Sequence, residues 1–325
     1  MAKVRKAVIT AAGRGTRQYP ASSAIQKEMF PLVDRDGLCK PVIQIIGEEA
    51  VAAGVEEICI VTQPGEEKQY CEYFKRMTDD TFRAFRGKDW AIIQSEKLQE
   101  FGERLTFVSQ DSPEGYGHAV YQAKKFVGDN PFLLMLGDHI YVSANHENCA
   151  TQLISKFKHS ELQAMSALQA TPGKLLHLFG TIKCDMIDSV RGTYKAEAIY
   201  EKPKEVYAAE HLRTHGLPPG MYLCHFGMHV FPPAIFDAIK YHIDNDIREK
   251  KEIQLTNAQE YMRANLLNDS YGGCTIDGQR FDTGIPYGLM ESQIALALAG
   301  THRAEIVEAI ARLLAEQLDS IAKRG

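Results

Sequence analysis

Short runs of β-branched and other apolar residues alternate along the chain with longer stretches whose apolar positions recur at helical spacing. The spacing predicts helices over 41–54, with Gly54 at the C-terminal end, and over 118–127. The runs that predict strands are 6–12, 56–62, 105–110, 132–138 and 163–171. Such alternation is typical of a mostly parallel sheet covered by helices.

The pattern changes near residue 180, where the chain becomes richer in strand signals and the sequence "HGLPPG" at 215–220 breaks any regular element. From 303 onward, apolar residues follow one side of a long predicted helix, a stripe that usually packs on its own domain and less often on a second subunit. We therefore predict an α/β fold: a doubly wound, mostly parallel mixed sheet of Rossmann-like type, with β-rich insertions and a helical C-terminus.

Composition and charge favour a small-molecule partner. The 325-residue chain is 45% apolar and carries a formal net charge of -5, so it offers no global attraction to nucleic acid or to an anionic membrane. No window approaches ~20 uninterrupted apolar residues, and no membrane span or export signal is expected. The seven cysteines form no C-x-x-C pair, which suits reduced thiols in the cytoplasm.

The sequence "AAGRGTRQYP" at 11–20 follows the first predicted strand and favours a phosphate-binding loop. Gly13 and Gly15 allow backbone amides to approach an anion, because neither residue has a Cβ. Gln18 stands where a dinucleotide fingerprint needs a third glycine, and a P-loop lysine motif is missing. Arg17 and Lys27 instead supply two cations that suit a triphosphate. The alternative is a tight turn with solvated basic residues.

Further polar residues follow predicted strands. Asp138 ends the apolar run 132–138, at the strand end where open α/β sheets bind ligands, although a single aspartate there is equally often a turn or helix cap. Glu201 and Lys202 end another strand pattern, and we expect them to point to opposite faces, with Pro203 keeping Lys202 extended. The alternative for this pair is an exposed charged turn.

The eleven histidines show no zinc-like spacing with Cys or Asp, and a structural role is expected for nearly all of them. His118 and His139 do adjoin candidate site motifs. No Ser/His/Asp signature of a nucleophilic enzyme is present.

Six segments in order carry a family resemblance: "AAGRGTRQYP", "KEMFPLVD", "GYGHAV", "YEKPK", "EIQLTNA" and "DTG". Together they resemble the bacterial UTP:glucose-1-phosphate uridylyltransferases of the sugar-phosphate nucleotidyltransferase superfamily, from about residue 4 to about residue 298. The resemblance implies a catalytic domain over 1–300 followed by a C-terminal helix over 301–325. It implies in-line, Mg²⁺-assisted transfer of a uridylyl group from UTP to glucose 1-phosphate, giving UDP-glucose and pyrophosphate. We expect a homo-oligomer.

The resemblance also assigns roles to individual residues. Those implied to bind the nucleotide are Ala11, Ala12, Gly13, Gly15, Thr16, Gln110, Gly115 and Gly117. The implied catalytic cations are Arg17, Lys27 and Lys202, the implied sugar-binding residues are Gly180 and Glu201, and the implied magnesium ligands are Asp138 and Asp282. A carboxamide such as Gln110 can pair with both the donor and the acceptor edge of uracil. Taken alone, Gln110 would more often be a surface residue at a strand end.

Alternatives stay open from the sequence. The nucleotide could be dTTP or the acceptor another sugar 1-phosphate, and a non-catalytic nucleotide-sugar-binding regulatory subunit is a candidate of another class, as is, more distantly, a Rossmann dehydrogenase. Arg14 stands where the family has an apolar residue, and "DRDGLCKP" lengthens a loop that is normally closer to "DKP". The segment 205–221 is a candidate roof over the sugar.

Overall fold

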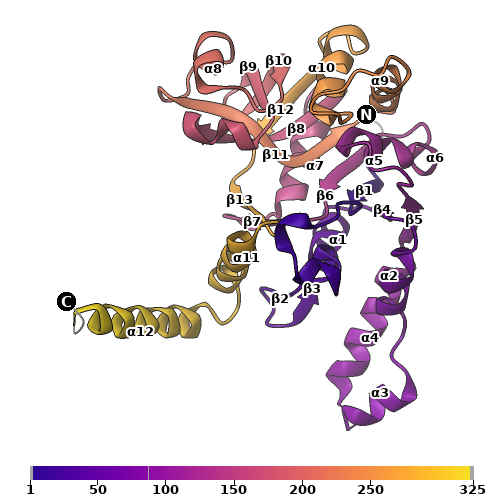
Figure 1. The fold of residues 1–325 in the computed structure, drawn as a ribbon, viewed down its shortest axis with the longest axis vertical. Coiled ribbons are helices and arrows are strands. Elements are labelled where there is room, and N and C mark those ends of the chain that lie inside the picture. The colour runs from indigo at the N-terminus through magenta and orange to yellow at the C-terminus, as the bar shows by residue number, and fades with distance from the viewer. Residues whose placement is uncertain (1–2, 87, 323–325) are drawn as a thin grey trace. The chain divides into compact units, whose positions relative to one another are not determined.

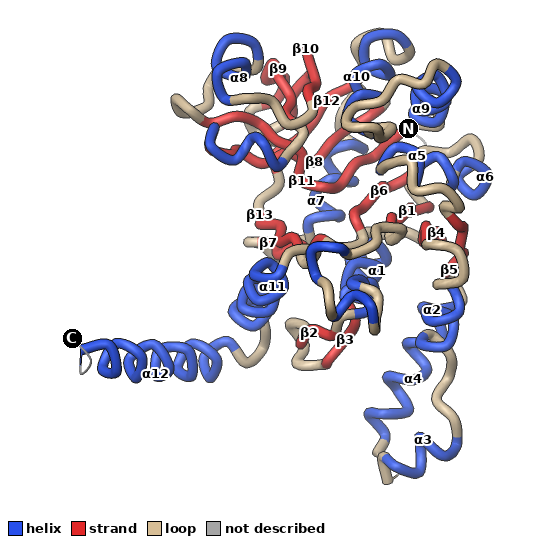
Figure 2. The backbone as a smooth tube through the Cα atoms, in the orientation of Figure 1, coloured by secondary structure: helices blue, strands red, loops and turns tan. Residues whose placement is uncertain are grey.

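The structure is a computed structural model that describes residues 3–86 and 88–322, with side chains up to residue 318. The chain divides into two compact units. Unit 1 comprises Met1–Gly13, Ala50–Leu136 and Ala150–Ile276, and unit 2 comprises Arg14–Glu49, Gly137–Cys149 and Asp277–Gly325. Figures 1 and 2 show the elements of both units.

Unit 1 is built on a nine-stranded mixed sheet with the order β5-β4-β1-β6-β11-β8-β12-β10-β9 (Figure 1). Its strands are β1 (Lys6–Thr10), β4 (Glu57–Thr62), β5 (Leu105–Ser109), β6 (Phe132–Leu136), β8 (Ala164–Pro172), β9 (Thr181–Asp188), β10 (Thr193–Tyr200), β11 (Met221–Phe231) and β12 (Tyr271–Thr275). Strands β5, β4, β1 and β6 are parallel, whereas β11 runs antiparallel to both β6 and β8. The parallel half therefore contains the strand that precedes the glycine loop.

Helices cover this sheet because its central strands are apolar on both faces: residues 58–62 of β4 and 132–135 of β6 are buried throughout. The helices of unit 1 are α2 (Glu67–Tyr73), α3 (Asp79–Ala84), α4 (Asp89–Gly102), α5 (Tyr116–Gln122), α6 (Lys124–Val127), α7 (Cys149–Lys158), α8 (Glu205–His211), α9 (Ala234–Asp244) and α10 (Leu255–Asn265), with the 3-10 helix η4 (Gly173–Leu178). Helices α5, α9 and α10 share one core with the strands, in which the rings of Phe132 and Phe236 stack at 5.4 Å. The predicted α/β fold with a mixed sheet is confirmed.

Unit 2 contains two small antiparallel ribbons and the C-terminal helices. Its elements are η1 (Thr16–Gln18), η2 (Ala21–Ser23), η3 (Lys27–Met29), β2 (Pro31–Val33), β3 (Cys39–Pro41), α1 (Val42–Ala52, which ends in unit 1), β7 (His139–Ser143), β13 (Gly278–Asp282), α11 (Pro286–Ala299) and α12 (Arg303–Ala322). Strand β2 pairs with β3, and β7 pairs with β13. The second ribbon joins two distant segments of the chain, since β7 begins at His139 and β13 begins at Gly278.

The structure corrects the sequence-based elements in places. The strands predicted at 6–12 and 132–138 end earlier, at Thr10 and Leu136. The helix predicted over 118–127 is two helices, α5 and α6, because the amide of Ala123 donates to the carbonyl of Val120 and so breaks the regular helical series. Gly54 ends α1 as predicted, with a φ of 91°.

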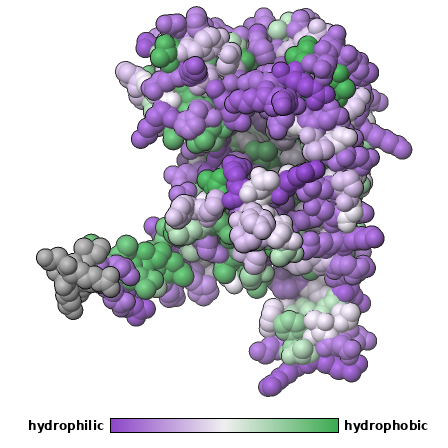
Figure 3. Space-filling model, in the orientation of Figure 1, coloured by the Kyte–Doolittle hydropathy of each residue, from purple (hydrophilic) through white to green (hydrophobic). Residues whose placement is uncertain are grey.

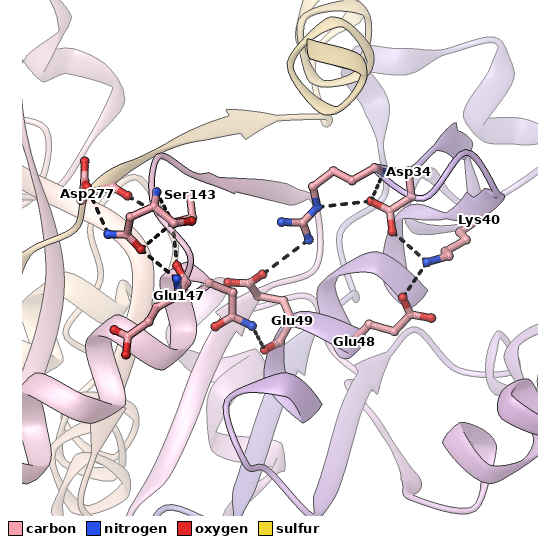
Figure 4. Close-up of polar contacts among 10 residues, drawn as sticks. Asp34, Lys40, Glu48, Glu49, Ser143, Glu147 and Asp277 are labelled. Atoms are coloured by element: carbon pink, nitrogen blue, oxygen red, sulfur yellow. Dashed lines mark hydrogen bonds and ion pairs between the residues drawn. The ribbon is translucent and has the colours of Figure 1, made fainter. Parts of the chain in front are cut away.

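The lengthened loop "DRDGLCKP" forms the β2–β3 hairpin, which a buried lysine anchors (Figure 4). The Lys40 ammonium lies 2.8 Å from a carboxylate oxygen of each of Asp34, Asp36 and Glu48. Burial opposes the charge of Lys40, but hydrogen bonds to the three carboxylates outweigh it and raise the pKa of this amine. Arg35 extends the network from Asp34 to Glu49 in α1.

A side-chain amide protects the outer edge of the same hairpin. The Gln293 carboxamide in α11 accepts a hydrogen bond from the Val33 amide at 2.8 Å and donates one to the Val33 carbonyl at 3.0 Å. Gln293 thus satisfies both backbone groups of a residue in an edge strand, as a third strand would. The hairpin and α11 are tied together within unit 2.

Helix α12 leaves much of its apolar stripe exposed. Val307, Leu313, Leu314 and Leu318 are 45%, 61%, 59% and 67% exposed, and Figure 3 shows apolar side chains along the visible face of this helix. The usual expectation, that such a stripe packs on its own domain, therefore does not describe these residues. Among the described helices, none combines the length and apolar character needed to cross a bilayer.

We predict that Lys40→Met lowers the free energy of unfolding by about 3 kcal/mol, because the change leaves the buried Asp34 carboxylate without its ammonium partner. Chemical denaturation followed by circular dichroism measures the effect. Lys75→Met is the matched control, since Lys75 forms only an exposed pair with Glu72 and should cost less than about 0.5 kcal/mol. Equal stability of the two variants would show that the hairpin does not depend on this lysine.

Candidate active site

Two carboxylates and a histidine meet at one end of the β7–β13 ribbon in unit 2. Asp138 follows β6 by two residues and directly precedes β7, whereas Asp282 is the last residue of β13. His139 and Asp282 are register partners across the ribbon, so their side chains are neighbours. Among the described residues, one potential ligand atom from each of the three lies within 4.8 Å of the other two.

Two cations compensate the negative charge of this cluster. The Lys27 ammonium lies 2.5 Å from Oδ2 of Asp138, and the Arg17 guanidinium lies 3.7 Å from Oδ2 of Asp282. Burial works against the charge of Lys27, yet the carboxylates of Asp138 and Glu28 prevail and raise its pKa. The structure thus brings together Arg17, Lys27 and both aspartates, the four residues of unit 2 to which the sequence assigned charge chemistry.

The same contacts hold Asp138 ionised. Burial alone would raise the pKa of its carboxyl group, but a hydrogen bond from Nδ1 of His139 to Oδ1, at 2.9 Å, and the charge of Lys27 hold the pKa well below its usual range. Asp138 is therefore a permanent anion at neutral pH. It suits the binding of a cation better than the transfer of a proton.

The backbone around the cluster is fixed by hydrogen bonds. Both the amide and the hydroxyl of Thr283 donate to the carbonyl of Asp138, at 2.8 and 2.9 Å. The amide of Gly284 donates to Oδ1 of Asp282 at 2.8 Å. The side-chain amide of Gln18 donates to the carbonyl of Thr283, which links the glycine loop to the end of β13.

Gly284 is needed for the two carboxylates to come together. A Cβ at this position would lie 2.7 Å from Oδ2 of Asp138, 2.9 Å from Oδ1 of Asp282 and 3.4 Å from the Arg17 guanidinium. The first two distances are shorter than real Cβ contacts allow. Any larger residue must therefore displace the charged groups.

The glycine loop of unit 2 also depends on a conformation that glycine adopts readily. Gly15 has φ 60° and ψ 27° and leads into η1, which contains Thr16 and Arg17. A Cβ on Gly15 would meet Ser22 at 3.0 Å and the Lys27 side chain at 3.8 Å. The loop is folded back on itself, and this brings Lys27 close to the glycine turn. Arg14 is exposed in this loop, and nothing in the structure explains its presence there.

In unit 1, Ala11 and Ala12 are buried directly after β1, and the amide of Ala11 donates to the carbonyl of Val61 in β4 at 2.7 Å. Gly13, which follows them, is exposed. Gln110 follows β5 and is 6% exposed, so it is not the surface residue that strand ends usually carry. Its carboxamide lies 3.1 Å from the carbonyl of Gly115 and 3.1 Å from Nδ1 of His118.

The second glycine turn packs against the chain before α10. A Cβ on Gly115, whose φ is 112°, would lie 2.7 Å from Glu252, and a Cβ on Gly117 would lie 2.9 Å from the carbonyl of Ile253. The Gly117 amide donates to that same carbonyl at 2.8 Å. The structure brings Gln110, Gly115 and Gly117 together, and backbone packing already accounts for both glycines.

The predicted sugar-side residues lie elsewhere in unit 1. A Cβ on Gly180 would lie 2.9 Å from the His225 ring and 3.0 Å from Thr256. The geometry predicted for Glu201 and Lys202 is wrong: Lys202 has a positive φ of 44°, and its ammonium lies 3.0 Å from Oε1 of Glu201. The strand ends at Tyr200, so the alternation of a regular strand does not apply to the two residues, and their attraction pairs them.

Sequence reasoning missed three residues of the charged cluster. His139 was noted only because it adjoins a candidate site motif, and its proximity to Asp282 depends on pairing between distant segments. Gly284 stands in the quoted "DTG" segment without having been assigned a role, and Gln18 served only to exclude a dinucleotide fingerprint. The short motif itself, a glycine two residues after an aspartate, was the signal available for Gly284.

The candidate roof 205–221 has an ordered anchor within unit 1. Helix α8 and the start of β11 share a small apolar cluster with η4, and its buried members are Leu176, Ala208, Leu212, Tyr222 and Cys224. The segment is therefore a packed element of its unit and not a free linker.

Comparison with solved structures gives the same fold. A UTP-bound UGPase from Acinetobacter baumannii is 26% identical, with a TM-score of 0.76 over 95% of this chain and 99% of that chain. A UDP-glucose pyrophosphorylase complexed with UDP-glucose is 25% identical, with a TM-score of 0.69 over 90% of this chain and 98% of that chain.

Sequence comparison extends over nearly the whole chain. The UTP–glucose-1-phosphate uridylyltransferase of Bacillus subtilis is 33% identical over 92% of this chain and 92% of its own length. The enzyme of the same name from Staphylococcus haemolyticus is 32% identical over 92% of this chain and 94% of its own. The nucleotidyl transferase family profile matches residues 6–271. The resemblance carried by the six motifs is thereby confirmed, and the chain belongs to the nucleotidyl transferase family, in the group that holds the UTP–glucose-1-phosphate uridylyltransferases.

Proposed function

We propose that this protein transfers the uridylyl group of UTP to glucose 1-phosphate, releasing pyrophosphate and forming UDP-glucose. A phosphate oxygen of the sugar phosphate attacks the α-phosphorus, and the bond from that phosphorus to the pyrophosphate oxygen breaks. The observation that carries the proposal is the cluster in which Lys27 and Arg17 pair with Asp138 and Asp282. The names of relatives that share at least 31% identity over at least 92% of this chain support the choice of UTP and glucose 1-phosphate.

The metal that we propose is Mg²⁺, held by Asp138 and Asp282. Two carboxyl groups within one small cluster supply the oxygen donors that this hard cation prefers, so the donor set fits it. Bound Mg²⁺ would neutralise phosphate oxygens of the nucleotide. The hydrogen bonds from Thr283 and Gly284 hold the segments that carry both aspartates.

Positively charged residues would do most of the remaining work, because the reaction joins two anions. We propose that Arg17 stabilises the charge that develops on pyrophosphate and that Lys27 contacts the phosphates of UTP. Ala11, Ala12, Gly13, Gly15 and Thr16 would surround the nucleotide, and Gln110, Gly115 and Gly117 would read the uracil. The burial of Gln110 supports a specific role for its carboxamide.

For the acceptor, we propose that Lys202 neutralises the sugar phosphate while Glu201 and Gly180 contact the sugar. The ion pair between Lys202 and Glu201 supports a joint role, because the lysine holds the carboxylate in one orientation. The segment 205–221 would cover the sugar, and its packed anchor supports a defined position.

We propose that residues 1–300 act as the catalytic domain and that the C-terminal segment 301–325, in which the structure describes helix α12 up to Ala322, serves assembly, so that the protein is a homo-oligomer. The exposed apolar residues of α12 support this role. We also propose a cytoplasmic location. The seven cysteines are free, and five of them are buried, as suits a reducing compartment.

We predict that purified protein releases pyrophosphate from UTP and glucose 1-phosphate with Mg²⁺, and that Arg17→Ala lowers kcat by about a hundredfold or more. A panel of UTP, dTTP and other nucleotides against glucose and galactose 1-phosphates, with products identified by mass spectrometry, measures the preference. Turnover of dTTP above UTP would contradict the nucleotide assignment, and equal use of the two sugars would contradict the glucose assignment. Absence of all turnover would favour a regulatory subunit.

We predict that Gly284→Ala lowers kcat by about a hundredfold and the melting temperature only slightly, because the added methyl group separates the carboxylates of Asp138 and Asp282 without removing any apolar contact of the core. Steady-state kinetics and a thermal melt measure the two effects. Gly65→Asn is the control, since a Cβ there meets nothing within 4 Å and asparagine tolerates the positive φ of 85°. Full activity of Gly284→Ala would show that the carboxylates need not approach so closely.

We predict that light scattering gives a mass that is a multiple of the monomer mass, and that Leu314→Glu lowers it by placing a charge in the apolar stripe of α12. Glu308→Ala, a change on an exposed polar residue of the same helix, should leave the mass unaltered. A monomeric wild-type protein would refute the assembly role of this helix.

A further inference from the structure

The pairing of β7 with β13 places His139 in the charged cluster. Because His139 and Asp282 are register partners in the β7–β13 ribbon, their Cβ atoms project from the same face. Its side chain is 13% exposed, as is that of Asp138, whereas Asp282 is 29% exposed. The imidazole therefore lies beside both carboxylates, and Asp282 is the most exposed of the three side chains.

The distances in the cluster are close to those between ligands of a single cation. Two adjacent donors of an octahedral ion with bonds of about 2.1 Å are about 3.0 Å apart, and two opposite donors are about 4.2 Å apart. Nδ1 of His139 and Oδ1 of Asp138 are 2.9 Å apart, and the donor atoms of all three residues lie within 4.8 Å. Small side-chain adjustments would suffice for all three to bind one ion.

Asp138 can serve a cation and Lys27 at the same time. The Lys27 ammonium contacts Oδ2, and His139 contacts Oδ1, so the two oxygens face different partners. A cation bound between Oδ1 and Nδ1 of His139 would take the place of the hydrogen bond between these atoms, with the imidazole neutral and its proton on Nε2, and it need not displace Lys27. Because Lys27 contacts Oδ2, only Oδ1 of Asp138 is left for the metal. A third protein ligand would then contribute more to the affinity of the site for the metal.

We propose that His139 is a direct ligand of the catalytic metal, together with Asp138 and Asp282, and that its nitrogen shifts the preference of the site from Mg²⁺ toward Mn²⁺. Mg²⁺ favours oxygen donors, whereas first-row transition ions gain affinity from an imidazole. The inference rests on the proposed metal site, and it adds a ligand and a metal preference that the two aspartates alone do not imply.

The first test is spectroscopic and does not depend on turnover. Electron spin-echo envelope modulation of Mn²⁺ added to the protein alone should show coupling to a directly bound ¹⁴N nucleus. The coupling should disappear in His139→Asn and in His139→Asp, and it should persist in His146→Asn, a change of an exposed histidine in the same unit. Bound Mn²⁺ without nitrogen coupling in the wild type would overturn the proposal.

The second test measures affinity by titration calorimetry with MnCl₂ and MgCl₂. We expect His139→Asn to weaken Mn²⁺ binding by about tenfold or more and Mg²⁺ binding by less than about threefold. His139→Asp, which replaces nitrogen by oxygen, should bind Mg²⁺ more tightly than the wild type does. Equal losses for the two ions would overturn the inferred preference, as would failure of either ion to bind the wild type.

Pyrophosphate release assayed on the same samples separates this inference from the proposed function. Uridylyl transfer that persists with no nitrogen coupling would refute the role of His139 and leave the reaction standing. Nitrogen coupling in a protein that transfers no uridylyl group would refute the reaction and leave the metal ligand standing.

Discussion

The approach of two carboxylates, those of Asp138 and Asp282, is the constraint on which the functional half of the structure depends. Carboxylate oxygens of the two residues lie within 4.8 Å of each other, and like charges at that distance repel. Partial burial of both side chains strengthens the repulsion. Lys27 and Arg17 offset it, and the glycine loop exists in a form that brings both cations to the same place. The loop thus carries counter-charges for the protein's own acids, in addition to the role toward phosphates that we propose for it.

Local patterns in the sequence predicted those strands and helix ends that depend on residues close together in the chain. The buried strands β4 and β6 have runs of apolar residues that only a sheet covered on both faces accommodates, and Gly54 ends α1 because glycine adopts a positive φ easily. Charge and spacing also singled out Arg17, Lys27 and Asp138, and the family resemblance added Asp282. The structure gathers these four residues in one cluster.

What the sequence could not predict depends on pairing between distant segments or on competition between weak preferences. The ribbon of β7 with β13 makes His139 a neighbour of Asp282, and no local pattern contains that information. For Lys202, the preference of a residue before proline for extended backbone lost to a left-handed turn that permits its ion pair with Glu201. The anchored β2–β3 hairpin likewise needed Lys40 to meet carboxylates before the turn, within it and in α1.

The Gln293 clamp on Val33 has a consequence for solubility. An exposed edge strand offers unpaired backbone groups to any other extended chain, and the β2–β3 hairpin has only two short strands to satisfy them. By filling both hydrogen-bonding positions of Val33 with a side chain that cannot propagate a sheet, α11 ends the ribbon at two strands. The β2 edge of the hairpin therefore presents fewer unpaired backbone groups on which another extended chain could add as a strand.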